Sequence, residues 1–388
     1  MKAFFADQIF DGKKLIDNAV LIIDEGKIVW VGAENEIPSE ITLPTLRKHV
    51  SFIMPGLIDC HVHLALLNHT PVSPIDWALC SVEAMQHLRE LRKAGVVACR
   101  DLGSNDSIII GIAKAQRQGL LQDMPRVVAA GAALAATGGH GTNISIECDG
   151  ADEFTKACRQ VIKNGAEVIK VMMSGGVNSP GEEPGPPEVN EDEIIAAVRE
   201  AHARGRKVAV HAHGNTAIRR SVNAGVDSIE HGVFNSEDLI EQMAAQGTAL
   251  VPTLCAPYYA VQEGLRVEPD NPDHKRSQAI VAEHNHNTRL AFEKGVMVCM
   301  GTDAGCPFNP HDRAFYEAVL LHKTGIPALD VLRIATLNGA ILLGLDKELG
   351  TLDAGKQASF LILDTSPVKD IEALCADKQI YIQGKKVE

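Results

Sequence analysis

The chain has 388 residues, and 45% of them are hydrophobic, which is enough apolar side chain to bury a large core. The formal net charge is −13, and no cluster of lysine or arginine with interleaved aromatic residues occurs, so nucleic acid is excluded as an expected partner. The nine cysteines are scattered without a Cys-x-x-Cys pair, a pattern that favours reduced thiols in the cytoplasm over a disulfide framework. Because no long apolar run occurs and an acid appears as early as Asp7, neither a membrane span nor a signal peptide is expected.

Both ends of the chain are rich in short β-type segments that are separated by turns. The N-terminal segments are Phe4–Ile9, Ala19–Asp24 and Lys27–Val31, and the C-terminal segments are Ala358–Leu363, Gln379–Ile382 and Lys385–Val387. The middle of the chain has a different character. We therefore expect residues 1–55 and 346–388 to form one small β-sandwich domain beside a main domain of residues 56–345.

The middle of the chain repeats one pattern, in which a helical segment ends at a glycine and a short apolar, often β-branched segment follows. The glycines of this pattern are Gly95, Gly165, Gly205, Gly225, Gly247 and Gly295. With further strands at Leu57 and at Val127–Ala130, the pattern gives eight strands that alternate with helices, as a (β/α)8 TIM-type barrel requires. A doubly wound open sheet is the alternative, but no Gly-x-Gly-x-x-Gly follows the first strand.

Two histidines close the first strand of this expected barrel. The apolar pair Leu57-Ile58 begins the strand, and His61 and His63 follow two residues apart. Side chains alternate along a strand, so both imidazoles point to the same side. They could bind one metal ion together, or they could be two core histidines that have their own hydrogen-bond partners.

The residues at the ends of the later strands favour the metal site. In a barrel, functional side chains gather at the C-terminal ends of the strands. The candidates at those ends are His61, His63, Lys170, His211, His231 and Asp303. Chance does not readily place six such residues at equivalent positions, so the sequence predicts a metal centre at the mouth of the barrel.

Lys170 is the unusual member, because an ammonium group has no lone pair to offer a cation. Burial near a metal would lower its pKa and leave an amine that can react with carbon dioxide. The product is a carbamate, an anionic oxygen ligand that can bridge two metals. A lysine that only neutralises a nearby acid is the alternative.

Several motifs resemble the amidohydrolase superfamily in its two-metal form with a carboxylated lysine. They include Pro55-Gly56-Leu57-Ile58-Asp59-Cys60-His61-Val62-His63, Gly301-Thr302-Asp303-Ala304-Gly305 and the segment 335–356 that leads back to the C-terminal strands. Thr137-Gly138-Gly139-His140-Gly141 and Met173-Ser174-Gly175-Gly176-Val177 resemble the group of imidazolonepropionase-like proteins and metal-dependent Xaa-Pro and Xaa-Arg/Lys dipeptidases. The chain departs from the family at Ala358-Ser359-Phe360, where Ala-Asp-Leu is usual, far from the expected metal site.

This resemblance implies a mechanism in which a hydroxide that bridges two divalent metals attacks an amide carbonyl. It places His61, His63 and Asp303 on the more buried metal, and His211 and His231 on the other. Carboxylated Lys170 bridges the two ions. Asp303 moves the proton from hydroxide to the leaving amine. Zinc is the expected metal, although manganese, cobalt or iron would also suit these ligands.

The substrate contacts are less sharply indicated by the sequence. His140, in the loop after the third strand, could act in catalysis by orienting the substrate carbonyl or its carboxylate, or it could brace the loop. His213 lies two residues after His211 and so faces the same mouth. Tyr258 and its neighbour Tyr259 could form a pocket wall or only pack. The turn-rich loop 178–187 is a candidate lid, and its Glu182 and Glu183 could attract a basic side chain or be solvated.

Four functions remain open at this point. We expect a dipeptidase of the Xaa-Pro or Xaa-Arg/Lys type, which acts on a small-molecule or dipeptide substrate and could form a homo-oligomer. A hydrolase of a cyclic amide or lactone would use the same metal site. A mononuclear deaminase or imidazolonepropionase is disfavoured by Lys170 and by His213-Gly214-Asn215, where a deaminase needs a glutamate. A non-catalytic family member is disfavoured because every expected ligand is present.

Overall fold

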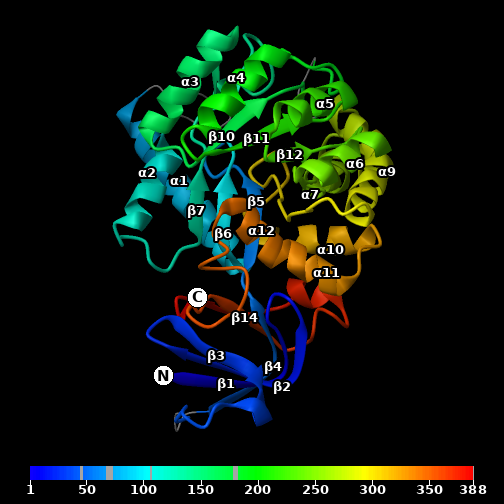
Figure 1. The fold of residues 1–388 in the computed structure, drawn as a ribbon. Helices are drawn as coiled ribbons and strands as arrows, with labels where there is room; N and C mark the ends of the chain where they lie inside the picture. The colour runs from blue at the N-terminus through cyan, green and yellow to red at the C-terminus, as the bar shows by residue number, and fades with distance from the viewer. Residues whose placement is uncertain (44–46, 67–72, 105–106, 178–181, 388) are drawn as a thin grey trace.

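The computed structural model describes residues 1–43, 47–66, 73–104, 107–177 and 182–387. Figure 1 shows a barrel of strands surrounded by helices, with a separate sheet below it that contains both ends of the chain. The first part of the candidate lid, residues 178–181, lies outside the described residues. The expected α/β architecture, a barrel beside a β module built from both termini, is confirmed.

The terminal sheet has seven strands in the order β16-β15-β14-β4-β1-β2-β3. Its strands are β1 (Lys2–Phe10), β2 (Leu15–Asp24), β3 (Lys27–Ala33), β4 (Arg47–Pro55), β14 (Phe360–Leu363), β15 (Gln379–Ile382) and β16 (Lys385–Val387). Neighbouring residues of β1 bury opposite faces, with Phe4 against Phe360 and Phe5 in a separate apolar cluster. The sheet therefore joins the two termini, and we keep residues 1–55 and 346–388 as the proposed limits of this domain.

The barrel strands run parallel and form two hydrogen-bonded groups, β5-β6-β7 and β13-β12-β11-β10-β8-β9. They are β5 (Leu57–Val62), β6 (Val96–Asp101), β7 (Arg126–Ala129), β8 (Ala133–Ala135), β9 (Ser145–Glu147), β10 (Val168–Met172), β11 (Lys207–Ala212), β12 (Ser228–His231) and β13 (Ala249–Val251). Almost every residue of these strands is buried, because helices cover the outside and side chains fill the inside. Since β5 follows β4 after a single glycine, the N-terminal end of β5 adjoins the terminal sheet and its C-terminal end points away from it.

The expected eighth strand, at Val296–Val298, is reduced to isolated bridges. Val298 pairs with Leu250, and Ala304 pairs with Val62, so the segment still closes the barrel between β13 and β5. Gly301 lies between these bridges in very close contact. A Cβ there would come within 2.3 Å of Val251 and 3.0 Å of His61. The tight closure therefore requires glycine and leaves little room for a regular ladder.

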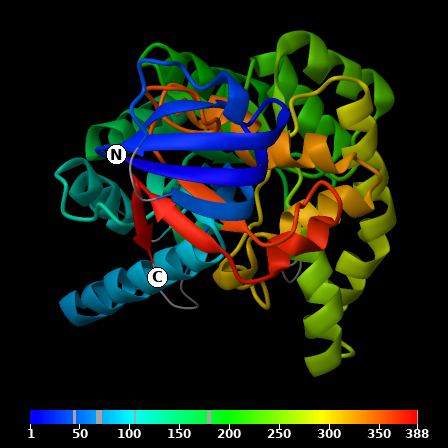
Figure 2. The same cartoon turned by 90° about the horizontal axis from the view of Figure 1, so that it is seen from below.

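The described part of the chain contains the following helices, most of which surround the barrel (Figure 1). They are α1 (Pro74–Lys93), α2 (Ile108–Arg117), α3 (Ala151–Asn164), α4 (Glu191–His202), α5 (Asn215–Ala224), α6 (Glu237–Gln246), α7 (Cys255–Tyr259), α8 (Leu265–Val267), α9 (Pro272–Glu293), α10 (Tyr316–Lys323), α11 (Ala328–Arg333) and α12 (Gly339–Leu343). Helices α3, α5 and α6 end at glycines in the left-handed conformation, as the repeated glycine pattern predicts. Figure 2, viewed from below, shows the terminal sheet lying across the barrel, with α1 projecting to one side.

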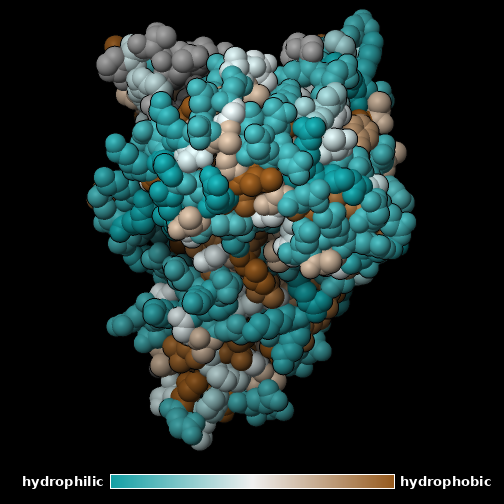
Figure 3. All heavy atoms as spheres, turned by 45° about the horizontal axis from the view of Figure 1, so that its top comes forward, coloured by the Kyte–Doolittle hydropathy of each residue, from teal (hydrophilic) through white to brown (hydrophobic). Residues whose placement is uncertain are grey.

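The surface in Figure 3 is mostly hydrophilic on the face shown, with hydrophobic atoms in small separate groups. Across the part of the chain that the structure describes, we find no helix with the length and apolar character needed to cross a membrane.

Candidate active site

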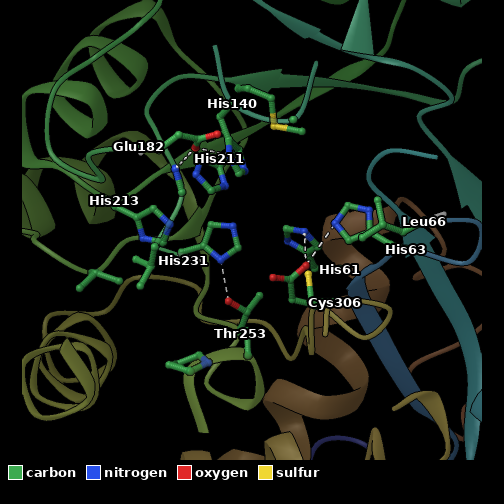
Figure 4. Close-up of a pocket in the computed structure, with 18 of the residues that line it drawn as sticks. His61, His63, Leu66, His140, Glu182, His211, His213, His231, Thr253 and Cys306 are labelled. Atoms are coloured by element: carbon green, nitrogen blue, oxygen red, sulfur yellow. Dashed lines mark hydrogen bonds and ion pairs between the residues drawn. The ribbon is translucent and has the colours of Figure 1, made fainter. Parts of the chain in front are cut away.

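A cavity of about 540 Å³ opens at the C-terminal ends of the barrel strands. Eight of the side chains predicted from the sequence line it: His61, His63, His140, Lys170, His211, His213, His231 and Asp303. Figure 4 shows the imidazoles facing one another across this cavity, from elements far apart in the sequence. The barrel therefore brings together the strand-end residues that the sequence predicted as a group.

The two histidines of the first strand face the cavity, and both rings have a fixed orientation. His63 Nδ1 donates a hydrogen bond to the carbonyl oxygen of Gly103 at 2.6 Å, and His61 Nδ1 donates to Glu230 Oε2 at 2.9 Å. The other nitrogen of each ring points at Asp303, with Nε2 to Oδ1 distances of 3.4 Å for His61 and 3.1 Å for His63. A histidine that donates from one nitrogen to a fixed acceptor presents the lone pair of the other nitrogen, as metal-ligating histidines do.

Three residues at strand ends adopt a left-handed backbone that non-glycine residues seldom take. Their φ angles are 70° at His231, 56° at Thr253 and 60° at Asp303. The turn at His231 breaks the strand alternation, so that it lines the cavity although Glu230, its neighbour in the chain, contacts His61 inside the barrel. His231 Nδ1 lies 2.7 Å from Thr253 Oγ1, and this hydroxyl donates to the Pro252 carbonyl, so His231 is the donor to Thr253. Such local strain is typical of functional sites.

The remaining imidazoles form a compact group. The ring centroids of His211 lie 4.6 Å from those of both His213 and His231, and the rings of His213 and His231 stack at 4.8 Å. Burial lowers the pKa of His213 to about 3 and holds the pKa values of His211 and His231 well below the usual range. The three rings are therefore neutral at pH 7 and can offer lone pairs to a cation.

The donor set fits divalent metal ions. Three groups have potential ligand atoms within 4.8 Å of one another: His211, His213 and His231; His61, His231 and Asp303; and His63, Asp303 and Cys306. Although burial alone would raise it, the nearby histidines and Lys170 hold the pKa of Asp303 well below its usual range, so the group is an ionised carboxylate. Imidazoles with a carboxylate are the ligands that zinc and related ions prefer. The sequence prediction did not include Cys306, although it follows Asp303 by only three residues.

Lys170 is buried inside the barrel, with 1% of its surface exposed. Burial lowers its pKa to about 8, against the opposing charges of Glu230 and Asp303. Glu230 pairs instead with Arg100 at 2.9 Å, and Asp303 Oδ1 faces the Nε2 atoms of His61 and His63. Within the described ranges, neither carboxylate forms an ion pair with Lys170. The structure therefore gives little support to the alternative that Lys170 only neutralises an acid, and its lowered pKa makes part of the amine neutral near pH 8.

We propose that Lys170 is carboxylated, and its lowered pKa predicts the pH range in which carbon dioxide would be added. Only the neutral amine adds carbon dioxide, and the neutral fraction rises between about pH 7 and about pH 9 for a pKa near 8. We expect the carbon-13 signal of a carbamate in labelled bicarbonate to grow over this range. The Lys170→Ala variant should lack this signal. The Lys207→Ala variant should retain it, because Lys207 lies at the N-terminal end of β11, away from the cavity. A spectrum of Lys170→Ala that matches wild type would contradict this expectation.

A buried charge network lies beneath the candidate ligands, and sequence reasoning missed it. The guanidinium of Arg100 donates to Glu230 Oε1 at 2.9 Å and to the Cys60 carbonyl at 2.6 Å, and Ser228 Oγ donates to Glu230 at 2.6 Å. Burial would raise the pKa of Glu230, but Arg100 and His61 lower it, so the carboxylate stays ionised. This fixed carboxylate sets which nitrogen of His61 carries the proton. The available signal was the charged pair Arg100-Asp101 at the end of an expected buried strand, β6.

A second buried acid positions the segment that carries Asp303. Asp59 accepts hydrogen bonds from the backbone nitrogen of Thr302 at 3.0 Å, from its hydroxyl at 2.7 Å and from the backbone nitrogen of His61 at 3.2 Å. Asp59 therefore ties the end of β5 to the loop after the eighth strand position. The sequence motif contains Asp59, but nothing in the sequence alone indicated this partner.

His140 lies beside the candidate metal ligands. Its ring stacks on His211 with centroids 4.2 Å apart, and its Nδ1 lies 2.7 Å from Glu182 Oε2. Glu182 also accepts from the backbone nitrogen of Gly176 at 2.7 Å. Instead of being simply solvated, Glu182 contacts His140 and lines the cavity.

Tyr258 differs from the other predicted contacts, because it is not among the residues that line the cavity. Its hydroxyl lies 3.1 Å from the hydroxyl of Tyr316, and its ring also packs against Tyr259. The preceding residues of α7, Ala256 and Pro257, form that part of the wall. The helical turn of α7 thus directs Tyr258 toward α10, and of the two roles that the sequence left open this position favours packing.

A parallel barrel with neutral imidazoles, a carboxylate and a buried lysine at its mouth has the features of the barrel hydrolases that act with bound metal. Comparison with known proteins gives the particular family. Residues 52–387 match the model of the Amidohydrolase family, and the chain belongs to this family.

Individual relatives agree with this assignment. Ochratoxinase from Aspergillus niger is 30% identical over 95% of this chain and 82% of its own length. The solved structure of a Xaa-Pro dipeptidase with methionine bound in its active site has a TM-score of 0.87 and 28% identity, covering 100% of this chain and 99% of that one. A putative prolidase from Bifidobacterium longum has a TM-score of 0.86 and 27% identity, covering 100% and 94%. The chain is therefore a hydrolase of the class that acts on C–N bonds.

Proposed function

We propose that this protein is a metal-dependent dipeptidase, with substrates of the Xaa-Pro or Xaa-Arg/Lys type. The observation that carries the proposal is the position of His140 and His213, which pack directly against the candidate ligands His211 and His231. A dipeptide has a carboxylate close to its scissile bond, so its recognition needs hydrogen-bonding groups next to the reacting atoms. The similarity to a Xaa-Pro dipeptidase and a putative prolidase supports the same substrate class.

The ligand roles that the family resemblance implies suit this geometry. We propose that His61, His63 and Asp303 hold one ion, that His211 and His231 hold a second, and that carboxylated Lys170 lies between them. Zinc suits this donor set best. When bound, the two ions supply an activated water and polarise the carbonyl of the substrate. His213, which the structure groups with His211 and His231, is retained as a substrate contact.

The side chains of the protein then complete the hydrolysis. Asp303 accepts the proton that is released when water adds to the amide carbon, and it delivers a proton to the leaving nitrogen. Asp59 and Thr302 keep its backbone in place, and Glu230 keeps the ring of His61 oriented. His140 orients the substrate carbonyl or carboxylate while Glu182 fixes its ring. The cavity of about 540 Å³ lies within the usual range for small-molecule sites and suits a dipeptide.

Hydrolysis of a cyclic amide or a lactone is the second candidate. Two apolar groups help to line the cavity and could receive a ring: Leu66 with Ile144, and Val177 with Val233 and Ile280. One relative of this chain is named ochratoxinase, so similarity to this chain is not limited to dipeptidases. This candidate would use the same metal ligands. A non-catalytic role is less favoured, because all the proposed ligands are present around the cavity.

Screening the zinc-loaded protein against a library of L-Xaa-L-Xaa dipeptides tests the proposal. We expect hydrolysis of a subset of these peptides, and loss of that activity after metal removal with a chelator. Small cyclic amides and lactones are screened in parallel. Activity on those compounds with no dipeptide hydrolysis would replace the first candidate by the second.

Removing either proposed substrate histidine should weaken dipeptide binding selectively. His140→Ala and His213→Ala are expected to raise KM for a dipeptide by about tenfold, the loss of one polar contact, and to raise KM much less for an uncharged ester or lactone. His202→Ala, on the outside of α4, is the matched control and should leave both values unchanged. Equal increases for charged and uncharged substrates would argue against a carboxylate contact.

A further inference from the structure

A second group of metal-type side chains lies outside the cavity, where α1 meets the short 3-10 helix His311–Arg313. It consists of His87, Glu90 and His311, whose potential ligand atoms lie within 4.8 Å of one another. The two rings stack with centroids 4.2 Å apart and planes inclined by 13°. None of these residues lines the active-site cavity, and the proposed mechanism gives them no part.

The hydrogen bonds of the two rings fix which nitrogens are free. His87 Nδ1 donates to the carbonyl oxygen of Leu64 at 2.9 Å, and His311 Nε2 donates to the carbonyl oxygen of His63 at 3.1 Å. A carbonyl can only accept, so each neutral ring must have its proton on that nitrogen. His87 Nε2 and His311 Nδ1 then present lone pairs. Within the described part of the chain, neither of these two nitrogens makes a hydrogen bond.

Glu90 completes the group from the same face of α1. Residues three apart on a helix are neighbours, so its carboxylate lies beside the ring of His87. One oxygen, Oε1, accepts from Gln86 Nε2 at 3.0 Å, which leaves acceptor capacity on the carboxylate. Ligand atoms around a tetrahedral ion lie roughly 3.4 Å apart, and each imidazole binds an ion that lies in its own ring plane, so the half-buried His87 ring must turn out of its stack on His311 to complete a site.

We propose that His87, Glu90 and His311 form a binding site for a single divalent cation that is separate from the catalytic centre. Two imidazoles and one carboxylate favour zinc over magnesium or calcium, which prefer oxygen ligands. Both rings already donate to backbone carbonyls, the arrangement that typically orients histidine ligands of a metal. The bound ion would hold both rings in place and so stabilise their hydrogen bonds to the carbonyls of Leu64 and His63. These carbonyls lie at the end of the segment that carries the proposed ligands His61 and His63.

Equilibrium dialysis against micromolar free zinc tests this site by difference. Wild-type protein should bind about one ion more than His87→Gln, whose amide keeps a donor for the Leu64 carbonyl but lacks the imidazole lone pair. Glu90→Gln should weaken the zinc affinity of this site by about tenfold and leave the fold intact. His202→Gln, a helical histidine beside Asp227, is the matched control and should bind as wild type.

Anomalous scattering at the zinc edge would locate the ion. A peak between His87 and His311 in zinc-soaked crystals, absent from His87→Gln crystals, is the expected result. Equal zinc content in wild type and His87→Gln, or no peak at these residues, would overturn the proposal. Either outcome leaves the catalytic centre unaffected, because that centre is tested separately by its own residues.

Discussion

Replacing Lys170 by alanine is expected to lower the hydrolytic activity by at least about 100-fold. Loss of a residue that only orients a metal ligand typically costs up to about 100-fold, and loss of a ligand itself should cost at least as much. The reason is its position: a buried amine with a lowered pKa, surrounded by imidazoles, and without an ion pair to the acids nearest to it in the described structure. Without the carbamate, the two ions would lose their shared anionic ligand. Steady-state kinetics on the best dipeptide from the library measures the effect.

Chemical rescue distinguishes a lost ligand from a damaged fold. A short carboxylate such as formate or acetate could occupy the space of the missing side chain, and we expect it to restore part of the activity of Lys170→Ala. Lys207→Ala is the control, because Lys207 is also partly buried but hydrogen-bonds the carbonyls of Ile341 and Leu342 away from the cavity. Full activity of Lys170→Ala without any added carboxylate would show that the bridging role is wrong.

The Asp303→Asn variant is expected to fold normally and to lower kcat by about 100-fold or more, as when a positioned proton-transfer group is lost. The amide keeps the shape of the side chain but cannot accept the proton. The unusual backbone of Asp303, with φ at 60°, is also tolerated by asparagine.

Zinc content and kcat should be measured together in this variant. Asp312→Asn, an exposed acid nine residues later, serves as the control. A fall in kcat with zinc retained supports proton transfer, whereas simple loss of zinc would identify Asp303 as a ligand only. Wild-type turnover of Asp303→Asn would exclude both roles.

Much of the fold and of the proposed site could be predicted because both depend on short-range patterns. Alternation along β5 puts His61 and His63 on one side, and the repeated glycine-then-strand pattern gives the positions of Lys170 and His211 in the same barrel. Strand ends converge in a parallel barrel, so knowing the strands is enough to expect that these side chains meet. All of them line one cavity in the structure.

Other features depend on contacts between distant segments and could not be predicted in this way. The left-handed turn at His231 places it and Glu230 on adjoining parts of the barrel interior, which strict alternation would forbid. The roles of Arg100 and Asp59 depend on partners more than 120 residues away. The eighth strand is irregular because Gly301 allows β13 and β5 to close tightly around it. The orientation of Tyr258 also depends on a distant residue, because its hydroxyl contacts the hydroxyl of Tyr316 on another helix.

A crystal structure of the zinc-loaded protein, grown in bicarbonate and measured at the zinc edge, tests the central proposal most directly. We expect two anomalous peaks at the mouth of the barrel, about 3.5–4 Å apart as in other two-metal sites. Continuous density should extend from Lys170 Nζ to a carboxylate group between the peaks. A single peak, or an unmodified Lys170 with both ions present, would contradict the two-metal centre with a carboxylated lysine.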